Sequence, residues 1–127
     1  YYTHGSQVTV SHGHLAFFGA YALLNLTVFY FAMPGLRGVE IYQATKAKLG
    51  FWTMCSAMML MGLTFGIAGV LQSYLERVLG MGYMTAQSYM RLWMAVTLVF
   101  GVFFLAGVLI TVFDLLSPKA ATAEQER

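Results

Sequence analysis

Charged side chains are scarce in this 127-residue chain, and its first part has none. Lysine, arginine, aspartate and glutamate make up 9% of the residues, against about 25% in ordinary soluble domains. None of the four occurs between Tyr1 and Leu36. The composition therefore predicts a membrane protein, or a piece of one, surrounded by membrane lipid. The chain also lacks a basic stripe, so we expect no nucleic-acid partner.

The chain has a single cysteine, no signal-peptide pattern and no initiator methionine. Cys55 is the single cysteine and lies in an apolar segment, which excludes a disulfide framework and a CxxC site. No basic region precedes the first apolar run, so the secretory signal pattern is absent. The chain begins with Tyr1 rather than methionine. We expect it to be part of a longer protein whose main partners are the remaining helices.

Three apolar segments are each long enough to cross about 30 Å of hydrocarbon, which takes roughly 20 helical residues. They cover approximately residues 8–33, 49–75 and 90–116. We expect the first to end at Pro34–Gly35, a helix-terminating pair. Residues 117–127 form a polar, alanine-rich stretch that we expect to be a disordered tail. The sequence thus predicts an all-α membrane protein with three transmembrane helices.

Basic residues are unevenly shared between the two sides of the membrane that these spans define. The loop of residues 34–48 and the tail lie on one side and hold Arg37, Lys46, Lys48, Lys119 and Arg127. The other side holds Arg77 and Arg91. Five against two favours a cytoplasmic loop and tail. The first span then enters from the outer side.

Two histidines, His12 and His14, stand in the outer part of the first span. Ionisable groups in such a segment are costly to bury and are candidates for function. Residues two apart on an α-helix point about 200° apart, so one metal cannot take both imidazoles from an unbroken helix. Two metal groups, one on each side, can, and haem is large enough to fill both flanks. The alternative is a hydrated pair at the membrane interface.

The two histidines face different neighbours if the helix turns by about 100° per residue. The His12 side carries mainly small residues, and the His14 side is aromatic with one polar residue. The first set is Ala16, Gly19 and Leu23; the second is Phe17, Phe18, Tyr21 and Asn25. We expect Gly19 to let a planar group or another helix approach beside His12. We expect Phe18 to pack on the His14 side.

The second span contains a small-residue face and a methionine cluster. Gly62 and Gly66 form a GxxxG motif, with Gly69 one turn further on, and such residues allow close helix contact. Four methionines lie nearby: Met54, Met58, Met59 and Met61. Methionines can ligate copper(I), but their role as packing filler is the favoured interpretation.

At these positions the chain resembles the large subunit of bacterial nitric oxide reductase, within the haem–copper oxidase superfamily. The resemblance covers almost the whole chain and the last three of the family's twelve helices. The HxH motif of residues 12–14 is shared across the superfamily, whereas its flanks and the Val–Leu–Gly–Met loop of residues 78–81 indicate nitric oxide reductase. The matching segments are residues 2–5, 10–21, 32–34, 65–72, 75–81 and 89–91.

The resemblance implies specific roles for the two histidines. His12 would be the axial ligand of a high-spin haem b, and His14 an axial ligand of a low-spin haem b. The family's non-haem iron ligands and catalytic glutamates lie on helices that are not in this chain. The resemblance implies that the complete enzyme reduces two NO to N2O and water, and that this chain alone is inactive.

The resemblance also implies a location in the bacterial inner membrane and an electron donor, either a cytochrome c subunit or quinol. Two other interpretations remain open at this stage. One is a fragment of a cbb-type cytochrome c oxidase, which reduces O2. The other is a structural three-span membrane subunit without a cofactor.

Overall fold

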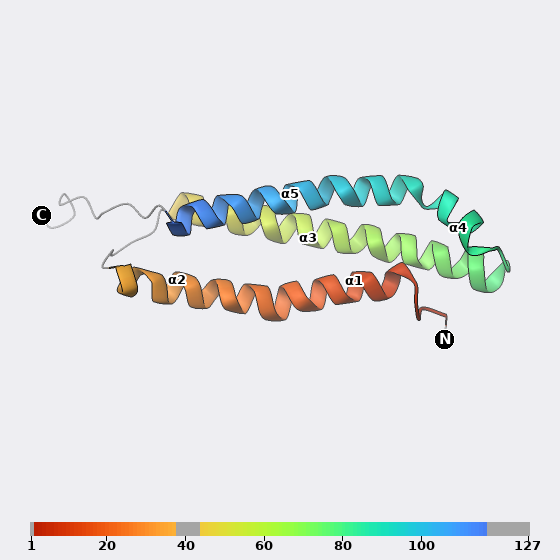
Figure 1. The fold of residues 1–127 in the computed structure, drawn as a ribbon, viewed down its shortest axis with the longest axis horizontal. Helices are drawn as coiled ribbons and strands as arrows, with labels where there is room; N and C mark the ends of the chain where they lie inside the picture. Colours follow the sequence, from red (N-terminus) through yellow and green to blue (C-terminus); the bar gives the residue numbers. More distant parts are fainter. Residues whose placement is uncertain (1, 38–43, 117–127) are drawn as a thin grey trace, which may run out of the picture.

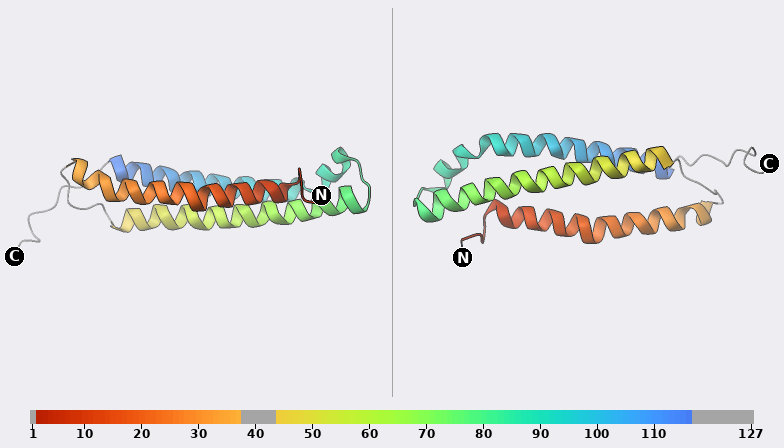
Figure 2. Two further views of the ribbon diagram at one scale, coloured as in Figure 1. Left: turned by 90° about the horizontal axis from the view of Figure 1, so that it is seen from below. Right: turned by 180° about the vertical axis from the view of Figure 1, so that it is seen from behind.

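Three long helical segments lie side by side and run in alternating directions (Figure 1). The computed structural model describes residues 2–37 and 44–116, and every regular element in those two ranges is a helix. The second segment contacts both of the others and lies between them in Figure 1 and in the right-hand view of Figure 2, whereas the left-hand view shows it displaced to one side. The expected all-α membrane architecture is therefore correct.

The first segment joins three elements into one rod: α1 (Gln7–Ala16), η1 (Phe17–Ala22) and α2 (Leu23–Arg37). Ser6 caps its start, because the Ser6 hydroxyl accepts a hydrogen bond from the Val8 N–H at 3.3 Å. This satisfies one of the backbone donors that a helix N-terminus leaves free. The preceding turn places Gly5 at a φ of 75°, a conformation that glycine adopts without steric cost.

The rod departs from the expected regular α-helix in two places. η1 is a π-helix, whose i→i+5 hydrogen bonds give a smaller turn per residue than the α-helix. The rod also continues past Pro34 to Arg37, so the predicted end at Pro34–Gly35 is wrong. Proline removes one backbone donor, but membrane helices tolerate this loss where other groups compensate for it.

The second and third segments form a helical hairpin. α3 (Ala44–Ser73) continues into the π-helix η2 (Tyr74–Val78), and a short α4 (Tyr83–Tyr89) leads into α5 (Arg91–Leu116). Gly80 reverses the chain after η2 with a φ of 67°. The Met81 N–H then donates to the Leu75 carbonyl at 3.0 Å. This turn lies at the same end of the molecule as the N-terminus (Figure 1).

α3 and α5 pack closely because small and hydroxylated residues line their contact. A Cβ atom at Gly107 would lie 2.8 Å from the Met54 backbone nitrogen, so only glycine fits there without movement. Further along, the Thr97 hydroxyl donates to the Thr64 hydroxyl at 2.9 Å, and both residues are buried. Such interhelical hydrogen bonds help to hold membrane helices together.

α1 rests on the glycine face of α3. A Cβ atom at Gly69 would clash with the backbone of Val8, and one at Gly62 would lie 2.8 Å from the Leu15 side chain. The Ser11 hydroxyl donates to the Gly62 carbonyl at 2.7 Å. The prediction that these glycines allow close helix contact is confirmed, and the partner is the helix that carries the histidines.

The methionine cluster fills the packed interior for the most part. Met54, Met58 and Met61 are buried, whereas Met59 is exposed. This distribution agrees with the interpretation of the cluster as packing filler.

The far end of the first rod is held more loosely than its start. The Tyr30 hydroxyl on α2 donates to Asp114 on α5 at 3.0 Å, and the Asp114 residue is only 2% exposed. Hollows separate α2 from α3 and α5 around this tie. The rod is therefore fixed along α1 and only tethered along α2.

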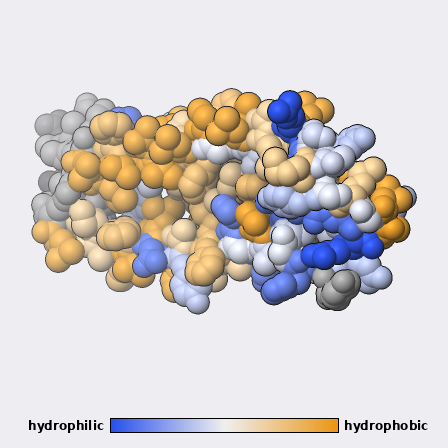
Figure 3. All heavy atoms as spheres, turned by 45° about the vertical axis from the view of Figure 1, so that its right-hand side comes forward, coloured by the Kyte–Doolittle hydropathy of each residue, from blue (hydrophilic) through white to orange (hydrophobic). Residues whose placement is uncertain are grey.

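Three helical segments have the length and composition of membrane spans: Gln7–Leu36, Thr45–Val78 and Arg91–Leu116. On the face shown in Figure 3, hydrophilic side chains gather at the end with the N-terminus and the α4 turn, whereas apolar side chains cover most of the other coloured surface. Residues 38–43 of the predicted loop and the predicted tail, 117–127, lie outside the described residues.

Candidate functional site

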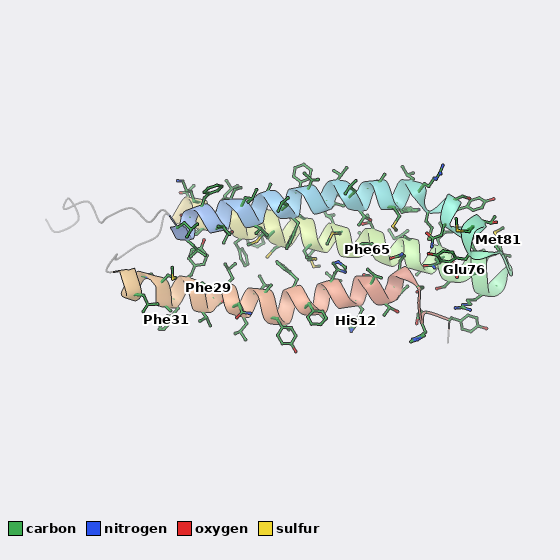
Figure 4. All side chains as sticks on the ribbon, in the orientation of Figure 1. His12, Phe29, Phe31, Phe65, Glu76 and Met81 are labelled. Atoms are coloured by element: carbon green, nitrogen blue, oxygen red, sulfur yellow. The ribbon has the colours of Figure 1, made fainter. Side chains whose placement is uncertain are left out.

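The two histidines lie on α1, in the half of the rod nearest the polar end. His12 is exposed and points away from α3 and α5 (Figure 4). His14 faces α3, where its ring contacts Phe65. Because α1 is a regular α-helix, the opposed directions expected from the spacing of two residues are present.

The His14 ring is held from two sides. Its Nδ1 lies 2.9 Å from the Val10 carbonyl oxygen, one turn back on the same helix. A carbonyl oxygen can only accept, so this hydrogen bond places the proton on Nδ1. With Nδ1 in this hydrogen bond, Nε2 is the ring nitrogen that can bind a metal. On the α3 side, the Phe65 ring lies with its centroid 5.3 Å from that of His14, at an interplanar angle of 36°.

A hollow of about 350 Å³ adjoins His14 between the rod and the other two segments. Phe18 lies on this side, with its ring 5.4 Å from that of Phe104 in an edge-to-face contact. Phe18 and Phe104 also border a second hollow, of about 330 Å³, that extends toward α2. Apart from His14, the lining of the first is apolar or glycine: Gly13, Phe17, Phe18, Ala22, Met58 and Phe104.

The His12 side of the rod is open. No hydrogen bond joins the His12 ring to any residue in the ranges 2–37 and 44–116. A Cβ atom at Gly19 would have none of their atoms within 4 Å. Phe31, which is 87% exposed, points the same way as His12 (Figure 4). This face presents an imidazole and apolar side chains to whatever lies beyond this chain.

The expected position of Leu23 on the His12 side is wrong. Leu23 is half-buried and lines the hollows that face α3 and α5. The cause is η1, which lies between Ala16 and Leu23 and turns less per residue than the α-helix used for the expectation. Directions calculated for a regular α-helix therefore no longer hold at Leu23, beyond the end of η1.

Another hollow, of about 830 Å³, lies between α1 and α3 and includes neither histidine. Its lining is apolar except for Ser11 and Tyr74, and it is bordered by Gly62 and Gly66. It offers no metal ligand of the imidazole, thiolate or carboxylate type.

The sequence did not reveal which residues of the other spans face His14. Phe65, Met58 and Phe104 have no spacing relation to the HxH motif, because they come from α3 and α5. Uniformly apolar helices give no periodic signal to tell one face from another. The glycine motif was the available clue, since Phe65 lies between Gly62 and Gly69 on the helix that α1 contacts.

The donor chemistry of the site fits groups that take one axial nitrogen from a helix. Within residues 2–37 and 44–116, no group of three or more histidine, cysteine, aspartate or glutamate side chains could enclose a metal ion. Each of the two imidazoles stands alone on its side of α1. Single histidine ligation of this kind is the common way in which proteins hold haem iron.

Comparison with known proteins places these observations in a wider group. Residues 1–103 match the family model described as Cytochrome C and Quinol oxidase polypeptide I. The chain is similar to a nitric oxide reductase subunit of Stutzerimonas stutzeri, with 41% identity over 115 residues. The match covers 84% of this chain and 24% of the relative. The chain thus spans about a quarter of the length of the relative.

Proposed function

The chain belongs to the Cytochrome C and Quinol oxidase polypeptide I family, and on this basis we propose that it forms part of a respiratory nitric oxide reductase. In this proposal His12 and His14 are axial ligands of two haem b groups. The observation that carries it is their arrangement on opposite sides of α1, one directed at α3 and one away from α3 and α5. The name of the relative, a nitric oxide reductase subunit, favours NO over O2 as the substrate.

His14 is suited to the low-spin haem b. Its Nδ1 proton is committed to the Val10 carbonyl, which leaves Nε2 to bind iron. A backbone acceptor on the second nitrogen of a metal-bound histidine fixes the tautomer and makes the ring more basic. The adjacent hollow and the aromatic ring of Phe18 provide an apolar border on this side. Haem iron, when bound, supplies redox chemistry that side chains lack.

His12 is suited to the high-spin haem b, on the side that faces the rest of the subunit. Its open surroundings require partners that α3 and α5 do not provide. We assign this role to the remaining helices of the same subunit, which would also carry the non-haem iron ligands. The short α1 backbone between the two imidazoles would then separate the two haem sites, with Gly13 between them.

The basic residues orient this arrangement in the bacterial inner membrane. Five basic residues lie on the side of the loop and the tail, against Arg77 and Arg91 on the opposite side, and this excess favours a cytoplasmic loop and tail. The histidines then lie toward the outer side. This is the side from which a cytochrome c subunit would deliver electrons, with quinol as the alternative donor.

The proposal is tested by the haem content and activity of the complete subunit that contains this chain. The wild type should retain two haem b groups and convert NO to N2O. The double variant His12→Ala/His14→Ala should retain neither haem and should not turn over NO. His4→Ala is the matched control, because His4 is exposed and precedes α1.

Two outcomes would overturn the proposal. Unchanged haem content in the double variant would instead support a structural three-span subunit without a cofactor. Loss of both haems in the double variant, together with a wild-type enzyme that reduces O2 and does not reduce NO, would support an oxidase of the cbb type.

A further inference from the structure

We propose that Phe65 on α3 is a positioning residue for His14, which sets the plane of the imidazole at the low-spin haem. The inference rests on the proposed function, because it assigns His14 to that haem. Phe65 would not touch the iron. It would act through the ring that does.

Two contacts restrict the two side-chain torsions of His14. The hydrogen bond from Nδ1 to the Val10 carbonyl, at 2.9 Å, ties one edge of the ring to its own helix. The Phe65 ring lies 5.3 Å away between centroids and is tilted by 36°, so rotation of the imidazole about its χ2 axis would drive it into the aromatic face. Neither contact alone fixes the plane, since the hydrogen bond permits rocking about its own direction.

The backbone around Phe65 is held at a set distance from α1. The carbonyl of Gly62, one turn before Phe65, accepts a hydrogen bond from the Ser11 hydroxyl at 2.7 Å. A Cβ atom at Gly62 would lie 2.8 Å from the Leu15 side chain. Gly69, one turn after Phe65, meets the backbone of Val8. Phe65 therefore stands between two close helix contacts, and its distance from His14 is fixed by them. Figure 4 shows Phe65 on the side of α3 nearest α1.

The orientation of an axial imidazole has a measurable consequence. Its plane decides which iron d orbital it overlaps and therefore the splitting of the low-spin ferric g values. Hydrogen bonding to the ring and exclusion of water around it also set the reduction potential. A positioning role for Phe65 thus predicts spectroscopic and electrochemical changes that a purely structural role would not produce.

The test compares ring-removing and ring-retaining variants in the assembled enzyme. Phe65→Leu and Phe65→Met keep an apolar side chain of similar volume and should retain the low-spin haem. They should shift its EPR g values and its midpoint potential. Phe65→Tyr keeps the aromatic ring and should restore values close to the wild type. Phe103→Leu is the matched control, because Phe103 is an exposed phenylalanine on α5.

Three results would overturn the inference. One is a retained low-spin haem in both ring-removing variants, with g values and potential no different from those of Phe103→Leu. Another is a shift of the same size in Phe65→Tyr. The third is failure of both ring-removing variants to assemble while Phe65→Tyr assembles, which would make Phe65 a packing residue only. Retention of the low-spin haem in His14→Ala would instead refute the proposed function, and that experiment does not involve Phe65.

Discussion

The imidazoles of His12 and His14 show how the same residue type can meet two environments two positions apart. His14 has a backbone acceptor and an aromatic neighbour, both within this chain. Both residues are exposed, but His12 lies on a face that α3 and α5 do not cover. An uncompensated polar ring inside a membrane costs free energy, so each imidazole needs a partner. The proposed haem irons supply those partners on opposite sides of one helix.

Gly19 and Phe18 allow a residue-level test of the two sides. A Cβ atom at Gly19 would have no atom of the described residues within 4 Å, so Gly19→Leu should leave the packing of α1 on α3 intact. We predict that it perturbs the high-spin haem and leaves the low-spin spectrum near normal. Phe18→Ala should do the reverse and more mildly, because Phe18 borders the hollow at His14. Resonance Raman spectra of each haem in the assembled enzyme would measure both effects.

The contrary outcome for this pair is equally specific. An unchanged high-spin haem in Gly19→Leu, or a complex that does not assemble, would remove the support for haem packing at Gly19. Helix–helix packing against the rest of the subunit would then explain the glycine.

At the scale of elements, two glycines of α5 differ in their contact with α3: Gly107 lies against the α3 backbone, and Gly101 does not. A Cβ atom at Gly107 would lie 2.8 Å from a backbone nitrogen of α3, whereas one at Gly101 would lie 3.9 Å from the Met61 sulfur. Gly107→Ala should therefore lower the stability of the subunit through overpacking, at a cost on the order of 1–3 kcal/mol. Gly101→Ala should be neutral or stabilising, since alanine favours helix by about 1 kcal/mol. The temperature of haem release in detergent would compare the two, and equal values would contradict this account of the α3–α5 contact.

The sequence predicted the elements through their length and apolar composition. Three uninterrupted apolar runs and the glycine face of the second were sufficient to predict three helices and a close contact. The π-helical turns η1 and η2 were not predicted, because no residue type in them forbids the α-helix. Pro34 was given too much weight as a helix end, since a helix near the membrane boundary can continue past one missing donor.

The candidate site was predictable only as far as local geometry extends. The opposed directions of His12 and His14 follow from helix geometry within α1. The direction of Leu23 does not follow from that geometry, because η1 changes the rotation about the helix axis between the histidines and Leu23. Phe65 and its contact with His14 depend on how α1 settles on α3, which is a tertiary effect with no local sequence signal.

At the scale of the whole molecule, the first span is conspicuously short of neighbours. None of the residues in its most hydrophobic window is buried, against 44% for the span that contains α3. The chain covers 24% of the relative. Both facts agree with a chain whose histidine-bearing helix packs against further helices.

A consequence is that the isolated chain should not reduce NO, even when haem and iron are added. The proposed low-spin haem needs a second axial ligand, and the non-haem iron needs a group of ligands that is absent from residues 2–37 and 44–116. NO consumption measured with an electrode, with N2O detected by gas chromatography, would check this. Steady turnover by residues 1–127 alone would contradict the proposed division of ligands.

The charge distribution predicts the orientation of the complete subunit. A reporter fused after Arg127 should be cytoplasmic, because five basic residues lie on the side of the tail and two on the opposite side. Paired fusions of alkaline phosphatase and a fluorescent protein would report the side. High phosphatase activity would contradict the predicted orientation and would place the histidines in the cytoplasmic half of the membrane.

The ligation of two haems from opposite sides of α1 is tested most directly by optical and EPR spectra of the single variants in the assembled enzyme. We predict that His14→Ala removes the low-spin haem signal and leaves the high-spin haem able to bind CO. His12→Ala should disturb the high-spin, CO-binding haem and leave the low-spin signal in place. Loss of one and the same haem in both variants, or of neither haem in either, would contradict the account.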